Sequence, residues 1–232
     1  MVVQTGFLRP MHMNNARNIP IFPLPMVACP TEWIPLHIFE ERYKDMIQHC
    51  RDCEESGSPG EFVILLTNED EVTNIGSTVR ICQILREHED GRLDIMTVAQ
   101  QRCRIVERYT EHSYDSALIE ILPDQERDWD ESLATEAFSL HRALLKLVSG
   151  DIPNDSSYSG KPSLSFYLAQ SAGMTTAQKQ EVLEARSENA RLELLIRHFK
   201  NLIVDIQNVR RAAKSIQSTW EMQLAIAKAE MD

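Results

Sequence analysis

The sequence of 232 residues predicts an α+β fold, with a strand-rich N-terminal half, one helix inserted among the strands, and a helical C-terminal half. Before Pro123, short apolar or β-branched segments alternate with turn residues, a pattern typical of strands. After Asp130, apolar residues recur at helical spacing. Neither proline nor glycine occurs between Glu188 and about Ala229, so one long helix is expected there. The expected division comprises a flexible N-terminal segment (1–18), a β subdomain (19–123) and a helical bundle subdomain (124–232).

The strands of the first half are expected to form a mostly antiparallel, partly closed barrel or sandwich, because several of them follow one another without intervening helices. The first two contain several prolines, which predicts sheet edges or bends, since proline donates no ladder hydrogen bond. Asp90-Gly91, between two alternating runs, predicts a hairpin with a positive φ in its turn. The expected strands are Ile19–Leu24, Trp33–Phe39, Glu61–Thr67, Gly76–Arg86, Leu93–Gln100, Arg102–Arg108 and Asp115–Leu122.

A single helix is expected among these strands, from Glu40 to Cys53, where apolar residues follow three-and-four spacing. Its end carries the spacing Cys50-Arg51-Asp52-Cys53, which also occurs in zinc and redox sites. The sequence has no second pair of this kind, whereas a structural zinc ion takes four ligands. We therefore expect reduced thiols, no metal ion and no other cofactor, with metal binding at Cys50 and Cys53 as the open alternative. We interpret His37, between two apolar residues of a strand, as structural.

The second half is expected to contain four helices. Asp130 is a suitable N-cap for the first, and Thr175 with Gln178 forms the signature of a capping box for the third. The last helix would be roughly 60 Å long at about 1.5 Å per residue, so part of it must leave the bundle or fold back. The expected helices are Ser132–Val148, Ser163–Ser171, Thr175–Glu184 and Glu188–Ala229.

The apolar stripe of the last helix permits two interpretations. A coiled coil or dimer would use its alternating spacing of three and four, and an amphipathic helix packed on its own domain would show the same spacing. The candidate oligomerisation residues are Ile206, Val209, Ile216, Trp220 and Leu224.

Composition and charge argue against several classes of partner. The chain carries 24 Lys and Arg against 35 Asp and Glu, and its net charge of −11 disfavours nucleic acid and anionic membranes. Arginines in the strand region leave a locally positive face as an alternative. No segment approaches the ~20 apolar residues of a membrane-spanning helix, and the first 18 residues do not resemble a signal peptide. The five scattered cysteines suit reduced thiols, so we expect a cytoplasmic protein.

The sequence offers no catalytic constellation. The Walker A motif, the nucleophile-elbow motif G-x-S-x-G and the metalloprotease motif H-E-x-x-H do not occur. We therefore expect a protein that is not an enzyme and has no catalytic residues.

Several segments, in one order, resemble a known family. These are Ile19–Leu24, Pro35–Tyr43, Ile75–Ile81, Asp90–Leu93, Gln101–Ile105, Gln178–Glu184 and Ala190–Leu192. Over roughly Ile19 to Phe199 the sequence resembles the N-terminal substrate-binding domain of Lon proteases. One departure is Thr31, which follows Pro30 where the family usually has glycine.

The resemblance implies a PUA-like β pseudobarrel followed by a helical bundle with a long terminal helix. Complete Lon proteases carry an ATPase module and a Ser-Lys protease domain as well, and neither is expected here, so the chain resembles a stand-alone Lon N-terminal domain protein. In this family the domain carries no catalytic residues. It recognises partly unfolded polypeptide through apolar and sheet-edge surfaces and helps to assemble the oligomer.

The resemblance therefore predicts a polypeptide-recognition or adaptor module for unfolded or degron-bearing segments, serving an ATP-dependent protease or chaperone. The alternatives are an oligomerisation or docking role for the long helix, an RNA-binding PUA-like protein, and a small-molecule site between barrel and bundle. The candidate polypeptide-binding residues are Trp33, Ile34 and Phe39 near the proline-rich strands, and Phe166 and Tyr167 near the junction. Each of these large apolar side chains also suits a hydrophobic core.

Overall fold

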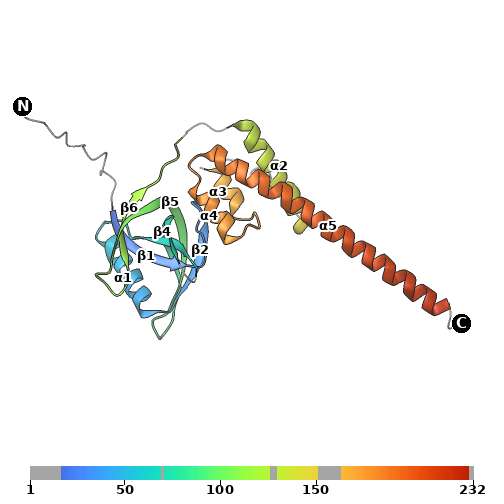
Figure 1. Cartoon of the computed structure of the whole chain (residues 1–232). Helices are drawn as coiled ribbons and strands as arrows, with labels where there is room; N and C mark the ends of the chain where they lie inside the picture. Colours follow the sequence, from blue (N-terminus) through green and yellow to red (C-terminus); the bar gives the residue numbers. More distant parts are fainter. Residues whose placement is uncertain (1–16, 69–70, 126–129, 151–162, 230–232) are drawn as a thin grey trace, which may run out of the picture. The chain divides into compact units, whose positions relative to one another are not determined.

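The computed structural model describes residues 17–68, 71–125, 130–150 and 163–229, with side chains up to Met222. It confirms the α+β class (Figure 1). The expected N-terminal segment lies outside the described residues up to position 16, and the first strand begins at Arg17. The elements in chain order are β1 (Arg17–Leu24), β2 (Trp33–Ile38), α1 (Glu41–Glu55), β3 (Glu61–Thr67), β4 (Val72–Glu87), β5 (Leu93–Tyr109), β6 (Ser116–Ile121), α2 (Glu131–Val148), α3 (Leu164–Ala169), α4 (Thr176–Glu184) and α5 (Glu188–Ala229).

The six described strands form one mixed sheet in the order β2-β5-β4-β3-β1-β6. An additional pairing of β5 with β6 closes this sheet into a barrel, while β2 pairs with β5 alone among the described strands. β1 and β3 are parallel, and the other pairs are antiparallel. Gly91 has a φ of 79°, which confirms the predicted hairpin turn between β4 and β5. Because β2 pairs only with β5 among the described strands, it is an edge strand, as Pro35 predicted.

One prediction is wrong at strand β5. The sequence predicted two strands, Leu93–Gln100 and Arg102–Arg108, and the structure has one strand of 17 residues. Its pairing shifts register between Ser77 and Val79 of β4 and between Ile105 and Glu107 of β5. Such irregularities bend a strand without ending it, so one strand pairs in turn with β2, β4 and β6. Gln101, which separated the two predicted strands, is an exposed residue within this single strand.

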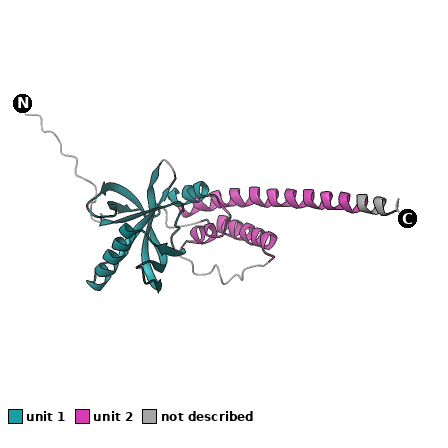
Figure 2. Ribbon diagram, turned by 90° about the horizontal axis from the view of Figure 1, so that it is seen from below, with its two compact units in different colours: residues 1–125, 175–186 teal, residues 126–174, 187–232 magenta. Residues whose placement is uncertain are grey.

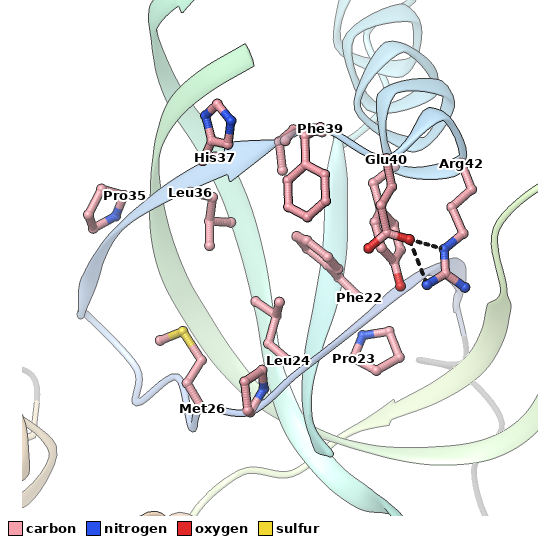
Figure 3. A pocket seen from close by; sticks show the side chains of 13 residues that line it. Phe22, Pro23, Leu24, Met26, Pro35, Leu36, His37, Phe39, Glu40 and Arg42 are labelled. Atoms are coloured by element: carbon pink, nitrogen blue, oxygen red, sulfur yellow. Dashed lines mark hydrogen bonds and ion pairs between the residues drawn. The ribbon is translucent and has the colours of Figure 1, made fainter. Parts of the chain in front are cut away.

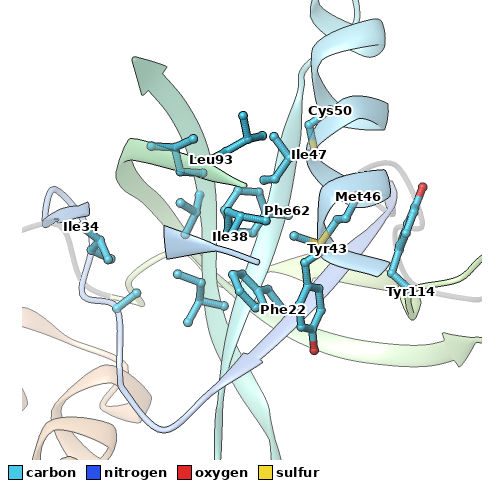
Figure 4. Packing of buried hydrophobic residues seen from close by; sticks show 14 of the residues in the cluster. Phe22, Ile34, Ile38, Tyr43, Met46, Ile47, Cys50, Phe62, Leu93 and Tyr114 are labelled. Carbon is cyan, nitrogen blue, oxygen red and sulfur yellow. The ribbon is translucent and has the colours of Figure 1, made fainter. Parts of the chain in front are cut away.

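The barrel core is closed by α1. Its buried residues Tyr43, Met46, Ile47 and Cys50 occupy the face that the three-and-four spacing predicted. They pack against strand residues, and the rings of Phe22 and Tyr43 lie 4.3 Å apart (Figure 4). The helix therefore contributes one side of the core.

The connection into β2 contains a strained residue. Thr31 has a φ of 70°, in the left-handed region that favours glycine. Its N–H donates to the carbonyl of Ala99 at 2.8 Å, and the N–H of Ala99 donates to the carbonyl of Glu32 at 3.0 Å. These bonds hold the start of β2 against β5. The positive φ of Thr31 explains why a glycine would suit this position.

The chain forms two compact units, residues 1–125 with 175–186 and residues 126–174 with 187–232 (Figure 2). The helix α4 thus belongs with the strands, which differs from the expected boundary at residue 123. Arg102, 3% exposed on β5, donates to the carbonyls of Leu183 and Ala185 at 3.0 and 2.5 Å and to Asp124 at 2.6 Å. A buried strand arginine therefore binds the last carbonyls of α4.

The helix boundaries follow the predicted caps. The Asp130 side chain accepts a hydrogen bond from the N–H of Ser132 at 2.8 Å. Thr175 and Gln178 form the predicted capping box at the start of α4. In the second unit α5 packs against α2 and α3, and from residue 208 to residue 222 all its described side chains are exposed. Among the described helices, none combines the length and apolar character needed to cross a membrane.

Candidate functional site

The exposed face of β2 is the first component of the candidate site. Side chains of a strand alternate between its faces, and here Ile34 and Ile38 point into the core while Trp33, Pro35 and His37 are exposed. Phe39 follows directly, and it and Trp33 are 60% and 63% exposed. Large aromatic side chains with this exposure on one edge strand are available for contact with a partner.

A groove with a volume of about 440 Å³ lies beside this strand, within the first unit. Such a volume falls within the range of ~300–1,000 Å³ typical of ligand pockets. Figure 3 shows Leu24, Leu36 and Phe39 around the groove, with Phe22 beneath Phe39. Glu40 and Arg42, which form an ion pair at 2.9 Å, supply a polar rim. The lining comes from the end of β1 with the loop after it, from β2, and from the start of α1; its residues are Phe22, Pro23, Leu24, Pro25, Met26, Pro35, Leu36, His37, Ile38, Phe39, Glu40, Arg42 and Tyr43.

The structure separates the five predicted polypeptide-binding residues. Phe39 lines the groove, whereas Trp33 lies on the same face of β2 but outside the groove lining. Ile34 is 3% exposed and belongs to the barrel core. Phe166, 4% exposed, and the half-buried Tyr167 belong to the second unit. Of the five, Phe39 and Trp33 present large exposed surfaces.

The five predicted oligomerisation residues are on α5. Val209, Ile216 and Trp220 are 69%, 60% and 63% exposed, and Ile206 is half-buried. Leu224 is part of the helix, but its side chain lies outside the described residues. An exposed apolar stripe is therefore present at three of the five positions.

The cysteine pair at the end of α1 is divided between core and surface. Cys50 is 1% exposed, its Sγ lies 3.6 Å from the carbonyl oxygen of Glu61, and burial raises its pKa to about 12. Cys53 is half-buried, and its Sγ lies 3.6 Å from Nε2 of His49. A buried thiol with a raised pKa is a poor nucleophile, so Cys50 acts as an apolar core residue.

Three potential metal ligands that the sequence analysis did not connect come together at one end of β2. Nδ1 of His37 lies 2.6 Å from Oδ1 of Asp94, and Nε2 of His88 lies 2.9 Å from Oδ2 of the same carboxylate. The hydrogen bonds from His37 and then His88 hold the pKa of Asp94 below its usual value. His37 and Asp94 are cross-strand partners of β2 and β5, and His88 precedes the hairpin turn. Only the strand register reveals this cluster, because 57 positions separate His37 from Asp94.

Three arginines of the strand region are buried or paired with acidic side chains. Arg102 is buried, as described above. Arg104 pairs with Glu120 at 2.6 Å, and Arg92 pairs with Asp90 at 2.7 Å. These pairings reduce the attraction that a nucleic acid backbone would find on this surface.

Comparisons with known proteins agree with the fold. A family model described as the ATP-dependent protease La (LON) substrate-binding domain matches residues 18–201. The structure is similar to that of a Lon N-terminal domain protein from Xanthomonas campestris, with a TM-score of 0.59 and 25% identity over 78% of this chain and 97% of that one. It is also similar to the N-terminal domain of a Mycobacterium avium complex Lon protease, with a TM-score of 0.59 and 19% identity over 79% of this chain and 98% of that one.

Proposed function

Because this chain belongs to the family of ATP-dependent protease La (LON) substrate-binding domains, we propose that it is a non-catalytic module that binds unfolded or degron-bearing polypeptide segments. In this proposal the bound segment is passed to a partner protease or chaperone. The observation that carries the proposal is the apolar groove beside β2, with the exposed ring of Phe39 at its side.

The groove suits apolar side chains of an extended segment. Its apolar wall is built by prolines and large side chains, and unfolded polypeptides differ from folded proteins in exposing such side chains to solvent. Glu40, Arg42 and His37 at the groove can pair with polar groups of the bound segment. The chemistry therefore favours a sequence-tolerant site with a few anchor positions.

In this proposal, burial of peptide side chains in the groove contributes more to binding than pairing of the peptide with the edge of β2. β2 is an edge strand, and an extended peptide could pair with its outer edge. Pro35, in the middle of β2, has no N–H and interrupts any such ladder. We therefore place the main contact in the groove, with Phe39 as the principal anchor and Trp33 as a flanking contact.

The test is fluorescence anisotropy of a labelled, permanently unfolded polypeptide titrated with the wild-type chain and with Phe39→Ala. Burial of a phenylalanine side chain contributes ~1.5–3 kcal/mol, so the substitution should weaken binding by about tenfold or more. Trp33→Ala should have a smaller effect. Val106→Ala is the matched control, because Val106 is an exposed apolar residue on β5, 58% exposed and outside the groove.

The stabilities of all three variants should remain within about 0.5 kcal/mol of wild type, as expected for exposed side chains. Equal affinity of Phe39→Ala and wild type would exclude the groove as the binding site. Equal affinity for the unfolded polypeptide and for a folded control protein of similar length would contradict the recognition of unfolded segments.

A second candidate function, self-association through α5, is favoured by the exposure of Val209, Ile216 and Trp220 on one helix. Apolar side chains at alternating spacings of three and four are typical of helix pairs. Sedimentation equilibrium of the wild-type chain should then give a mass above that of the monomer, and Val209→Ser with Ile216→Ser should restore the monomer. A monomeric wild type at high micromolar concentration would contradict this role.

A further inference from the structure

His37 lines the groove, and it forms a cluster with His88 and Asp94, which the proposed polypeptide site does not use. One ligand atom from each residue lies within 4.8 Å of the other two. The three residues come from β2, from the end of the β4–β5 hairpin and from β5, so the sheet register and the hairpin hold them together. Two imidazole nitrogens and a carboxylate converge on one point of the first unit.

The donor set and the spacing suit a divalent transition-metal ion. Imidazole and carboxylate are common ligands of Zn²⁺, at ~2.0–2.2 Å from the ion, and donors on a tetrahedral ion are therefore ~3.4 Å apart. The side chains of His37, His88 and Asp94 are 46%, 19% and 35% exposed. Rotations of these partly exposed side chains can therefore bring the three atoms to this separation. Three protein ligands leave further coordination positions for water.

The surrounding charge also favours a cation. Four acidic residues and two arginines lie between Arg86 and Asp94. Arg92 is paired with Asp90 at 2.7 Å, so these two charges offset each other and the remaining charge of the hairpin is negative. Asp94 supplies the carboxylate group of the cluster. An anionic ligand and a net negative hairpin are therefore present before any ion binds.

We propose that His37, His88 and Asp94 form a binding site for a divalent transition-metal ion, with Zn²⁺ as the ion of best fit. His37 coordinates through Nδ1 and His88 through Nε2. In the metal-free geometry these two nitrogens face the acceptor oxygens of Asp94 and carry the ring protons. On metal binding a neutral ring keeps its proton, which moves to the other nitrogen, and the lone pair of the first nitrogen binds the ion.

The bound ion connects β2 to the β4–β5 hairpin beside the groove. His37 stacks on Phe39, with ring centroids 5.9 Å apart and an interplanar angle of 24°. Fixing the His37 ring therefore restricts the neighbouring groove residue as well. Metal binding itself rests on the three ligands alone and does not depend on the proposed polypeptide recognition.

The test is isothermal titration calorimetry of ZnCl₂ into the chain without an affinity tag, in parallel with His37→Gln, His88→Gln and Asp94→Asn. Wild type should bind one ion in a saturable manner, and each variant should bind at least about tenfold more weakly, since loss even of an outer-sphere partner weakens metal binding ~10–100-fold. His49→Gln is the matched control, because His49 lies beside Cys53 and offers a competing place for zinc. This control should retain wild-type affinity.

Histidine ring correlation spectra in ¹⁵N NMR provide a readout that does not depend on the variants. Addition of Zn²⁺ should convert Nδ1 of His37 and Nε2 of His88 from protonated to metal-bound nitrogens and move the ring protons to the other nitrogen of each ring. The other five histidines of the chain should stay unchanged. Absence of saturable binding would overturn the proposal, as would an affinity that His49→Gln lowers and His37→Gln leaves unchanged. Ring protons that stay on Nδ1 of His37 and Nε2 of His88 at saturating Zn²⁺ would contradict the coordination geometry.

Discussion

The two halves of α5 carry apolar side chains at the same spacing. They differ in whether other helices of the unit cover these side chains. In the first half Leu192, Leu195 and Phe199 are fully buried against other helices of the unit. In the second half Val209, Ile216 and Trp220 are each at least 60% exposed. The spacing determines which side chains share a face of the helix, whereas only the neighbouring elements determine whether that face is core or surface. The first half of α5 therefore contributes to the core of the unit, and the second half is the part for which we propose association.

The largest effect of a substitution on the free energy of unfolding is expected at Arg191, a fully buried charged residue in the first half of α5. Its guanidinium donates to Ser165 at 2.7 Å and to Glu188 at 2.6 Å, and it lies 4.3 Å from the ring centre of Phe166. Arg191→Met would leave buried oxygens of Glu188 without this partner and should lower the free energy of unfolding by about 3–5 kcal/mol. Urea unfolding followed by circular dichroism measures this change.

Arg211→Met is the control for this prediction, because Arg211 is an exposed residue of the second half. It should change the free energy of unfolding by less than about 0.5 kcal/mol. Similar effects of the two substitutions would show that the second half of α5 is as closely packed as the first.

Truncations of apolar side chains to alanine compare the two halves. Leu195 is fully buried and Val209 is 69% exposed. Leu195→Ala should destabilise the chain by about 3 kcal/mol through lost burial and the cavity that remains, whereas Val209→Ala should change stability by less than about 0.5 kcal/mol. Chemical unfolding at low protein concentration, where association is weak, measures both. A large loss of stability in Val209→Ala would mean that the distal stripe is covered within one chain.

The sequence predicted the elements whose signals are local. The cap of Asp130, the capping box at Thr175 and the hairpin turn at Gly91 are confirmed because each depends on residues within a few positions. The continuity of β5 was not predicted, since a bend in a strand and a turn both contain polar residues.

The candidate sites show the same division between local and long-range information. The exposure of Phe39 and the burial of Ile34 follow from the alternation along β2, once the side that faces the core is known. The placement of α4 with the barrel rests on long-range contacts such as those of Arg102, and the cluster around Asp94 depends on the register of β2 with β5. Neither contact leaves a signal in the spacing of residues along the chain.

Acidification should weaken the covered half of α5 through His141. This histidine of α2 is 1% exposed, its ring centroid lies 5.4 Å from that of Phe199, and burial lowers its pKa to about 4. Between about pH 6.5 and 4 the unfolded chain binds a proton that the folded chain does not. The free energy of unfolding therefore decreases as the pH is lowered through this window. From pH 7.5 to 5.0 the loss attributable to His141 should be about 2 kcal/mol.

Urea unfolding of wild type and His141→Gln at the two pH values isolates this contribution from other titrating groups. The variant should be less stable at pH 7.5, because it loses the hydrogen bond to Ser171 at 2.9 Å, and its stability should depend less on pH. An unchanged pH dependence in the variant would show that His141 is not the group responsible.

The smallest expected energies concern the distal half of α5 itself. Residues 190–203 include the buried face of α5, and their backbone amides should exchange with solvent only through openings that cost several kcal/mol. The side chains of 208–222 are exposed, and the amides there should open at a cost of about 1 kcal/mol or less. Hydrogen exchange measured at low and high protein concentration distinguishes the two halves. If a second copy covers Val209, Ile216 and Trp220, protection of the distal amides should rise with concentration while that of the first half stays constant. Strong distal protection that persists on dilution would contradict both the open helix and its self-association, since it would require cover from within the same chain.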